Sequence, residues 1–471
     1  MIDFADGLGE MRGEMRFGCS FPPQGFEPGN AARGRRLLEG GREMSRMYAL
    51  VDANSFFCSC ERAMNPALRG KAVVVLSNND GIVVAATKEA KALGAKRGEP
   101  YFKIRGLEKA GKLAVFSSNY ELYGDLSERM MRAVASAAPQ IIQYSIDECF
   151  AVWDGAQNLA PWAEWGAKLK SRVMRRVGIP VCVGLAPSKT LAKLCCHLAK
   201  SHERFGGVLS HGDLPRAEFE ALIGDEPVGE IWGIGPRVAR RLNALGIWSA
   251  LDFARSDPHL IQGFFPLPVR RTRAELDGLD LIDLGDPSAG KKQIISSRSF
   301  GQCCSDMADI RAAVAYHVRV ASAKLRAQGG VAGKIAVYAY PNRFRPDWPA
   351  RGFELSARLD PPQSAFSPIN VIAQGLVESG FAPGSMYKKC GVALFEIEPA
   401  RRPVQAELFG AADPGSGRDD ALQSAIDRIG RRFGKNTLFL GDEARQGDWR
   451  MQRGKLSPVS PRSLAGLPVI D

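Results

Sequence analysis

A carboxylate closes the first strongly apolar segment of this chain, and two more follow at a predicted hairpin tip. Tyr48–Val51 is a short apolar run, typical of a buried strand, and Asp52 comes directly after it. Asp147 and Glu148 are adjacent in a turn between two further apolar runs. Because a buried carboxylate is costly without a positive partner, this arrangement demands a counter-charge.

A metal ion is one such counter-charge. Successive strand residues point to opposite faces of a sheet, but a turn relaxes this alternation and can aim Asp147 and Glu148 at one place. Three carboxylates in one cleft suit a pair of magnesium ions about 3.5–4 Å apart, the geometry of in-line phosphoryl transfer. The alternative interpretation is that the two adjacent acids are polar turn residues without a ligand.

Length, charge and cysteine content limit the class of protein. At 471 residues the chain exceeds what one hydrophobic core usually organises, so we expect two to four domains. The formal net charge of +12 indicates a polyanionic partner, either nucleic acid or an anionic membrane face. No window of about twenty residues is free of charge, so no transmembrane segment is predicted. The ten cysteines lack the CxxC spacing of a zinc site and are typical of a reduced cytoplasmic protein.

The periodicity predicts a multidomain chain of α/β and α+β class. From Gln293 to Glu396 it reads strand, helix, strand, strand, helix, strand, the β-α-β-β-α-β unit that packs two helices on one face of a four-stranded sheet. Earlier, Gly233-Ile234-Gly235 separates two short helical patterns, as in a helix-hairpin-helix module. Backbone N–H groups exposed by such glycines can bind a DNA phosphate without reading bases.

The first 46 residues show no apolar periodicity and no apolar stretch of the kind a signal peptide requires. We expect them to be disordered, or the true start to lie at Met44 or Met47.

Three motifs together resemble the Y family of DNA polymerases. They are Asp52-x-x-x-Phe56-Phe57, the turn Ser145-Ile146-Asp147-Glu148 and the block Lys71–Gly81, the last of which is similar to the UmuC branch. The resemblance runs from about Met47 into the C-terminal tail. It implies an error-prone translesion polymerase of the SOS type, which adds deoxynucleotides to a primer 3′ end opposite damaged template.

The resemblance also implies a right hand of palm, fingers, thumb and little finger. We expect an N-terminal extension at 1–46, palm at 47–55 and 117–210, fingers at 56–116, a helix-hairpin-helix thumb at 211–286, little finger at 291–398 and a tail at 399–471.

On this resemblance Asp52, Asp147 and Glu148 hold two catalytic Mg²⁺ ions, for which Mn²⁺ could substitute, and the backbone carbonyl of Ala53 adds an oxygen ligand. Phe57 is the steric gate, a ring that fills the space a ribose 2′-hydroxyl would need. The UmuC branch has Tyr at this place, so the bulk is kept and a hydroxyl is lost. The neighbouring Phe56 is assigned to nucleotide binding, with a core aromatic as the alternative.

The triphosphate needs cations. Lys88 and Lys91 lie about one turn apart on a predicted fingers helix, where many family members carry an aromatic residue and an Arg. Lys189 resembles the palm lysine that reaches the β- and γ-phosphates and stabilises the leaving pyrophosphate, with Lys193 as the alternative. Backbone-tracking DNA contacts are expected from Gly233, Gly235, Arg237, Arg240, Arg298 and Lys334.

In the tail, Gln405, Leu408 and Phe409 resemble the short peptide by which bacterial polymerases bind the β sliding clamp, a chance match being the alternative. The implied partners are primer-template DNA, dNTP, the clamp, a UmuD′ dimer-like accessory subunit and RecA, with no membrane. Two competing interpretations remain: a non-catalytic clamp-tethered scaffold of the same fold, and a polymerase IV-like enzyme independent of accessory subunits. The retained carboxylates argue against the first, and the long tail argues against the second.

Overall fold

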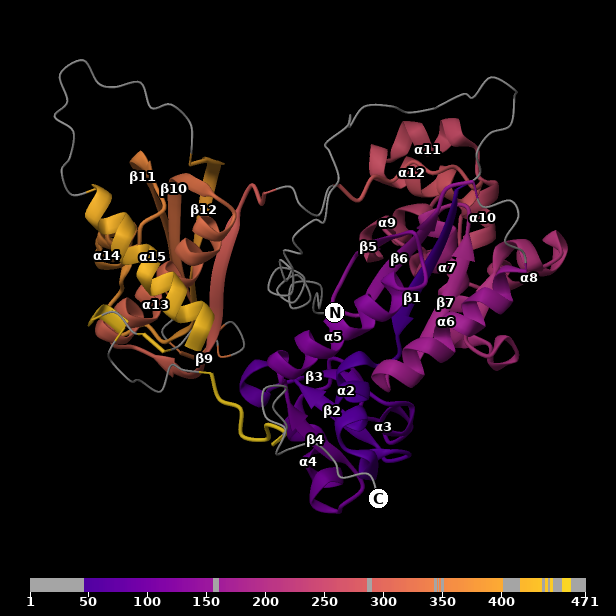
Figure 1. Ribbon diagram of the computed structural model, residues 1–471, viewed down its shortest axis with the longest axis horizontal. Helices are drawn as coiled ribbons and strands as arrows, with labels where there is room; N and C mark the ends of the chain where they lie inside the picture. The colour runs from indigo at the N-terminus through magenta and orange to yellow at the C-terminus, as the bar shows by residue number, and fades with distance from the viewer. Residues whose placement is uncertain are drawn as a thin grey trace. The chain divides into compact units, whose positions relative to one another are not determined.

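A computed structural model describes residues 46–155, 161–285, 290–342, 345, 347–348, 351–400, 416–433, 437–438, 441–443 and 451–458 (Figure 1). The chain divides into two compact units, each treated by itself below. Of the described residues, the first unit holds 46–75, 82–285 and 456–458, and the second holds 76–81 and 290–455. No helix among the described residues is long and apolar enough to cross a membrane.

The centre of the first unit is a five-stranded sheet in the order β5-β6-β1-β7-β8. Its strands are β1 (Met47–Ala53), β5 (Gln140–Gln143), β6 (Glu148–Trp153), β7 (Val181–Ala186) and β8 (Val208–Ser210). β1 lies in the middle and pairs antiparallel with both β6 and β7. Because β1 and β7 are central strands covered on both faces, they read as continuous apolar runs rather than as alternating patterns.

Alternate residues of β1 enter two different cores. Ala49 and Val51 join the core that contains α5 (Tyr120–Ala135) and α6 (Trp162–Val177). Tyr48 and Leu50 join the core that contains α7 (Lys189–Ser201) and the thumb helices. Because strand side chains alternate, Asp52 belongs to the α7 face.

α7 packs closely on β7 through a glycine (Figure 1). A Cβ at Gly184 would lie 2.1 Å from the carbonyl oxygen of Ala192 and 2.2 Å from the backbone nitrogen of Cys196. Only glycine permits this approach, which brings the length of α7 alongside the strand that borders β1.

A three-stranded sheet in the order β3-β2-β4 lies within the range predicted for the fingers. Its elements are α2 (Phe56–Met64), β2 (Val73–Leu76), β3 (Val83–Ala86), α3 (Lys88–Ala92), α4 (Tyr101–Lys109) and β4 (Ala114–Ser117). The range predicted for the thumb contains the helices α8 (Arg216–Gly224), α9 (Pro236–Asn243), α10 (Ala250–Arg255), α11 (Pro258–Phe264) and α12 (Leu267–Leu276). α2 follows β1 directly, which ties the position of its first residues to the end of the central strand.

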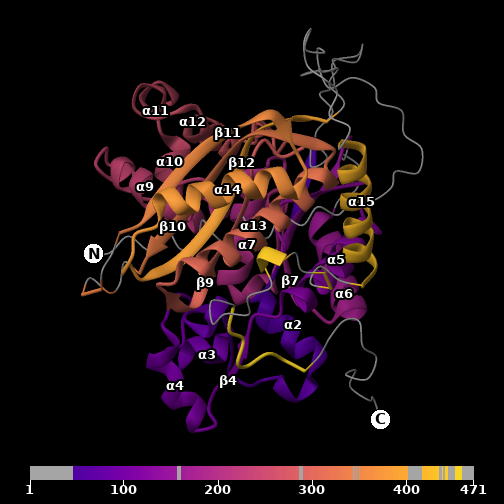
Figure 2. The same cartoon turned by 90° about the vertical axis from the view of Figure 1, so that its left-hand side faces the viewer.

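The second unit confirms the predicted β-α-β-β-α-β order. It runs β9 (Ile294–Cys304), α13 (Met307–Ala327), β10 (Gly330–Pro341), β11 (Phe353–Gln363), α14 (Phe366–Gly380) and β12 (Tyr387–Pro399). The antiparallel sheet has the order β11-β10-β12-β9, and both helices pack on it side by side (Figure 2). The tail helix α15 (Ser416–Phe433) adds to this unit through the ion pair of Arg326 with Asp427.

Two predictions fall outside the described residues. They concern the extension before residue 46 and the tail peptide with Gln405, Leu408 and Phe409.

Candidate active site

The structure places the three predicted acidic residues at the same end of the palm sheet. Asp52 on β1 and Glu148 on β6 are direct partners across the antiparallel pair. Asp147 precedes β6, and its carbonyl oxygen accepts a hydrogen bond of 2.9 Å from the backbone N–H of Ala53. That bond fixes the acidic turn against β1, so the turn lies next to the end of the strand.

Burial and mutual repulsion oppose ionisation here. Burial raises the pKa of Asp52 above its ordinary value, and the charge of Asp147 raises it further, although Lys200 acts in the opposite direction. Burial also raises the pKa of Glu148. The positive charge of Lys193 lowers this pKa, and the negative charge of Asp52 raises it further. The site therefore needs positive charge to hold both groups as carboxylates.

Two lysines of α7 supply positive charge to this cluster. The Nζ of Lys200 lies 2.6 Å from Oδ1 of Asp52, and the Nζ of Lys193 lies 2.6 Å from Oε2 of Glu148. The two lysines are about two turns apart and share one face of the helix. Burial alone would lower the pKa of Lys200, but Asp52 outweighs it and the net direction is upward.

Sequence reasoning missed Lys200 and treated Lys193 only as the alternative. The two-turn spacing of the lysines on a helix that packs against the carboxylate strand was the available signal. Lys193 also lies over two aromatic rings, 4.6 Å from the centroid of Tyr144 and 5.6 Å from that of Trp232. These rings hold its side chain on the carboxylate side of α7.

Lys189 is placed differently from the triphosphate role predicted for it. Its side chain is buried at the first residue of α7, where it forms an ion pair with Asp280 and lies 4.4 Å from the ring centroid of Tyr48. Asp280 also accepts hydrogen bonds of 2.6 Å from the Tyr48 hydroxyl and 3.1 Å from Arg46. Burial opposes ionisation of Asp280, but the bonds from Lys189 and Tyr48 outweigh it, so the net pKa is lowered.

Phe56 and Phe57 are both buried at the start of α2. The helix begins there because Ser55 takes a left-handed conformation with φ of 45°, which turns the chain sharply after β1. The Phe57 ring stacks on Tyr123 of α5 at a centroid distance of 4.6 Å and meets Tyr120 edge-on at 6.1 Å. Two aromatic residues of α5 therefore pack against the ring of the predicted gate.

The predicted phosphate and DNA contacts are spread over several elements. Lys88 and Lys91 are exposed on α3, where Lys88 pairs with Glu203 at 3.2 Å. Gly233 has φ of +86°, which favours glycine, and Gly235 is the N-cap of α9. Arg237 and Arg240 are exposed on α9 after this turn.

Arg298 lies on the helix-covered face of the little-finger sheet, and its contact with the template stays a prediction. It shares the parity of the buried residues Ile294 and Phe300 on β9, and its guanidinium lies 5.8 Å from the Tyr316 ring of α13. Lys334 on β10 alternates with the buried Ile335 and so belongs to the opposite face.

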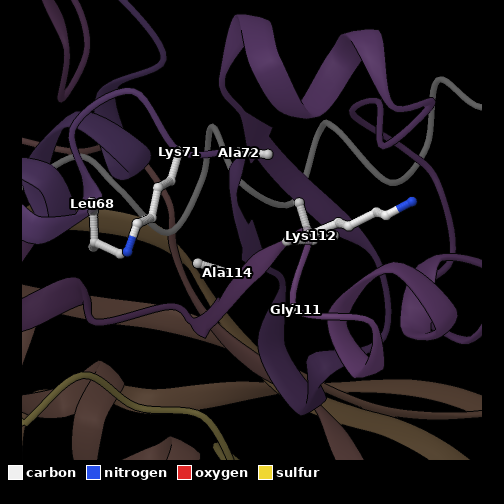
Figure 3. Close-up of a pocket in the computed structure, with 7 residues that line it drawn as sticks. Leu68, Lys71, Ala72, Gly111, Lys112 and Ala114 are labelled. Atoms are coloured by element: carbon white, nitrogen blue, oxygen red, sulfur yellow. The ribbon is translucent and has the colours of Figure 1, made fainter.

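The one pocket drawn in Figure 3 lies in the fingers, between residues 68–72 and 111–114. It contains none of the carboxylates, lysines or aromatic residues described above.

Four family models match the chain. They are the impB/mucB/samB family over residues 51–197, its C-terminal domain over 291–408, the IMS family HHH motif over 216–247 and a domain of unknown function over 420–470. The HHH match begins at α8 and contains the turn with Gly233 and Gly235.

Several curated proteins are similar over most of the chain. Protein SamB of Salmonella typhimurium is 36% identical over 90% of this chain and 99% of its own length, and Protein UmuC of Salmonella typhimurium strain LT2 is 36% identical over 88% and 97%. DNA polymerase IV of Pelotomaculum thermopropionicum is 28% identical over 83% of this chain and 93% of its own. A solved Y-family DNA polymerase chimera of Dbh and Dpo4 has a TM-score of 0.57 at 21% identity, covering 75% of this chain and 99% of its own, and so supports the fold.

A palm with paired carboxylates, fingers, a helix-hairpin-helix thumb and a β-α-β-β-α-β little finger define the right hand of a Y-family DNA polymerase. The chain belongs to the impB/mucB/samB family, the UmuC-like group of translesion DNA polymerases. The higher identity to UmuC and SamB than to polymerase IV confirms the prediction of a UmuC-like enzyme and disfavours the polymerase IV-like alternative.

The placement of Lys189 predicts that Asp280→Asn destabilises the palm. The substitution leaves a buried ammonium without its counter-charge, and we expect the free energy of unfolding to fall by about 3 kcal/mol, the lower end for a broken buried ion pair because Asp280 is partly exposed. Urea unfolding followed by tryptophan fluorescence measures it. The control is Asp154→Asn, which breaks the exposed pair with Arg46 and should cost less than about 1 kcal/mol. A raised KM for dNTP with unchanged stability would return Lys189 to the triphosphate role.

Proposed function

We propose that Asp52, Asp147 and Glu148 hold two Mg²⁺ ions, replaceable by Mn²⁺, for attack of a primer 3′-hydroxyl on the α-phosphate of a dNTP. The observation that carries the proposal is the direct pairing of Asp52 with Glu148 across β1 and β6, with Asp147 fixed beside them. The metal dependence of Y-family polymerases agrees with it. Retention of all three carboxylates argues against a non-catalytic scaffold.

The donor set fits a hard divalent cation. Carboxylate oxygens, with the backbone carbonyl of Ala53 next to Asp52, are the ligands that Mg²⁺ prefers. In the described part of the chain, no three Asp, Glu, His or Cys side chains already converge as ligands of one ion. Asp52 and Glu148 are instead neutralised by lysines, so the proposed ligands would exchange Lys200 and Lys193 for the metal. When bound, the ions would lower the charge repulsion between the triphosphate and the attacking oxygen.

Replacement of the lysines by metal ions also suggests which cations bind the triphosphate. Lys193 and Lys200, freed from the carboxylates, would face the negative triphosphate at the same end of the sheet, and they take the role that sequence reasoning gave to Lys189. Both are partly exposed, with side-chain exposures of 23% and 34%, so a nucleotide can reach them. Lys88 and Lys91 on α3 stay proposed contacts of the incoming nucleotide.

Primer-template DNA would contact the thumb turn and the open face of the little finger. The glycines at 233 and 235 expose backbone N–H groups beside Arg237 and Arg240, a combination that suits a phosphate. Lys334 lies on the sheet face that α13 and α14 leave uncovered, where it can neutralise backbone charge. We propose the bacterial cytoplasm as the compartment, because the proposed DNA substrate is found there.

Asp147→Asn tests the metal proposal. The amide is a poor ligand for a hard cation, so we expect nucleotide incorporation to fall by about a thousandfold or more while primer-template affinity stays within about threefold. Single-turnover extension and DNA-binding anisotropy measure the two quantities. Asp225→Asn, in the exposed loop after α8, is the control and should leave both unchanged. Extension by the Asp147 variant near the wild-type rate would show that the metal assignment is wrong.

Phe57→Ala tests the steric gate. Removing the ring opens space beneath the sugar, so the preference for dNTP over rNTP in kcat/KM should fall by about tenfold or more. Phe253→Ala is the control, because it empties a buried core position on α10 and should lower stability without changing sugar preference. Unchanged sugar preference in the Phe57 variant would place the gate elsewhere.

For the tail we propose that Gln405, Leu408 and Phe409 bind the β sliding clamp, and that a UmuD′-like dimer and RecA are further partners. The support is the peptide pattern and the similarity to UmuC. Leu408→Ala with Phe409→Ala should reduce extension only on clamp-loaded primer-template, because two buried apolar side chains contribute about 1.5–3 kcal/mol each before ordering costs. Equal loss on clamp-free DNA would mean that the pair is structural.

A further inference from the structure

One residue of the described C-terminal segment, Ser457, is buried in the first unit. Ser457 is 6% exposed, although the neighbouring Leu456 is exposed. Its hydroxyl accepts a hydrogen bond of 3.1 Å from the side-chain amide of Asn119 and donates one of 3.3 Å to Oε1 of Glu61. Figure 2 shows the yellow segment arriving beside α2. A residue from the far end of the chain therefore completes a polar cluster in the first unit.

The partner of Ser457 on α2 is a buried carboxylate that is satisfied by hydroxyl groups. Glu61 is 2% exposed, and its Oε1 also accepts a hydrogen bond of 2.7 Å from the Tyr123 hydroxyl. Burial raises the pKa of Glu61, and the bonds from Tyr123 and Ser457 offset this only in part. Among the described residues Glu61 has no salt-bridge partner, so the two hydroxyls carry its stabilisation.

This cluster leads directly to the proposed gate. Tyr123, whose hydroxyl is held by Glu61, is fully buried and stacks on Phe57 with an interplanar angle of 16°. Phe57 and Glu61 are one turn apart on α2, and Tyr123 lies on α5. The ring that supports the gate is thus fixed at its hydroxyl end by the residue that Ser457 binds.

Ser457 also holds the start of α5. Asn119, its second partner, is the N-cap of that helix, and Oδ1 of Asn119 accepts the backbone N–H of Leu122 at 3.2 Å. One hydroxyl therefore connects α2, which carries Phe57, with the cap of α5, which carries Tyr120 and Tyr123. Both of these tyrosine rings contact the gate.

We propose that Ser457 is a positioning residue for sugar selection: the C-terminal segment, part of the match to a domain of unknown function, fixes Tyr123 and so the Phe57 ring. The inference rests on the steric gate proposed above. Without Ser457 the Tyr123 ring loses part of its restraint, Phe57 can tilt, and room opens for a 2′-hydroxyl. Binding and reaction of dNTP, which fits beside the ring in either position, change little.

The test is kinetic and uses the full-length enzyme. The kcat/KM for dATP and for ATP opposite template thymine is measured for wild type, Ser457→Ala, Tyr123→Phe and Phe57→Ala. We expect the ratio of dATP to ATP to fall by about fivefold in Ser457→Ala and in Tyr123→Phe, which loses the same network but keeps the stacked ring. Ser379→Ala, which removes an exposed hydroxyl on α14, is the matched control and should leave the ratio unchanged.

The double variant Ser457→Ala with Phe57→Ala separates the possible outcomes. If Ser457 acts through the gate, its effect on the ratio disappears in the Phe57→Ala background. An undiminished effect there overturns the proposal, and so does an equal loss for both nucleotides in Ser457→Ala, which would indicate a merely structural role. No change of the ratio in Phe57→Ala alone refutes the gate assignment itself. Thermal unfolding of each variant confirms that the comparison is made between folded enzymes.

Discussion

The charge balance between the carboxylates at the end of the palm sheet and the lysines of α7 is the constraint on which the rest of this unit depends. Asp52 faces α7 because it has the parity of Tyr48 and Leu50 on β1. For a lysine to reach it, the helix must lie close to the sheet, and Gly184 permits that approach. Three features therefore contribute to the contact between the carboxylates and the lysines: the central strand β1, Gly184 on the neighbouring β7 and the lysine spacing of α7.

The same helix connects this chemistry to the thumb. Glu275 of α12 is fully buried, and its carboxylate accepts hydrogen bonds from the backbone N–H and the hydroxyl of Thr190, at 2.8 and 2.7 Å. A carboxylate at a helix N-terminus is favoured by the helix dipole. Ser188 adds a bond of 2.6 Å to the carbonyl oxygen of Glu275. The thumb is thus fixed to the first turn of α7, while the later turns of the helix carry the lysines that reach the carboxylates.

Local patterns and long-range contacts were not equally predictable. The acidic turn, the strand that ends in Asp52 and the little-finger order are short-range features, and the sequence predicts them because strand and helix periods are local. Lys200 and Ser457 required knowledge of which elements pack together. For Arg298, the apolar residues two and four positions away on the same strand already indicate the helix-covered face.

Buried carboxylates are accommodated in two ways in this unit, and the difference separates reactive from structural groups. Burial raises the pKa of Asp52, Glu148 and Glu61 alike, so the direction of the shift does not distinguish them. Asp52 and Glu148 are balanced by partly exposed lysines, which another cation can replace. Glu61 is held by two buried hydroxyls, and a cation arriving there would have to displace Tyr123 or Ser457. A carboxylate whose partner is exchangeable can act in catalysis, whereas one whose partners are part of the packed core fixes geometry.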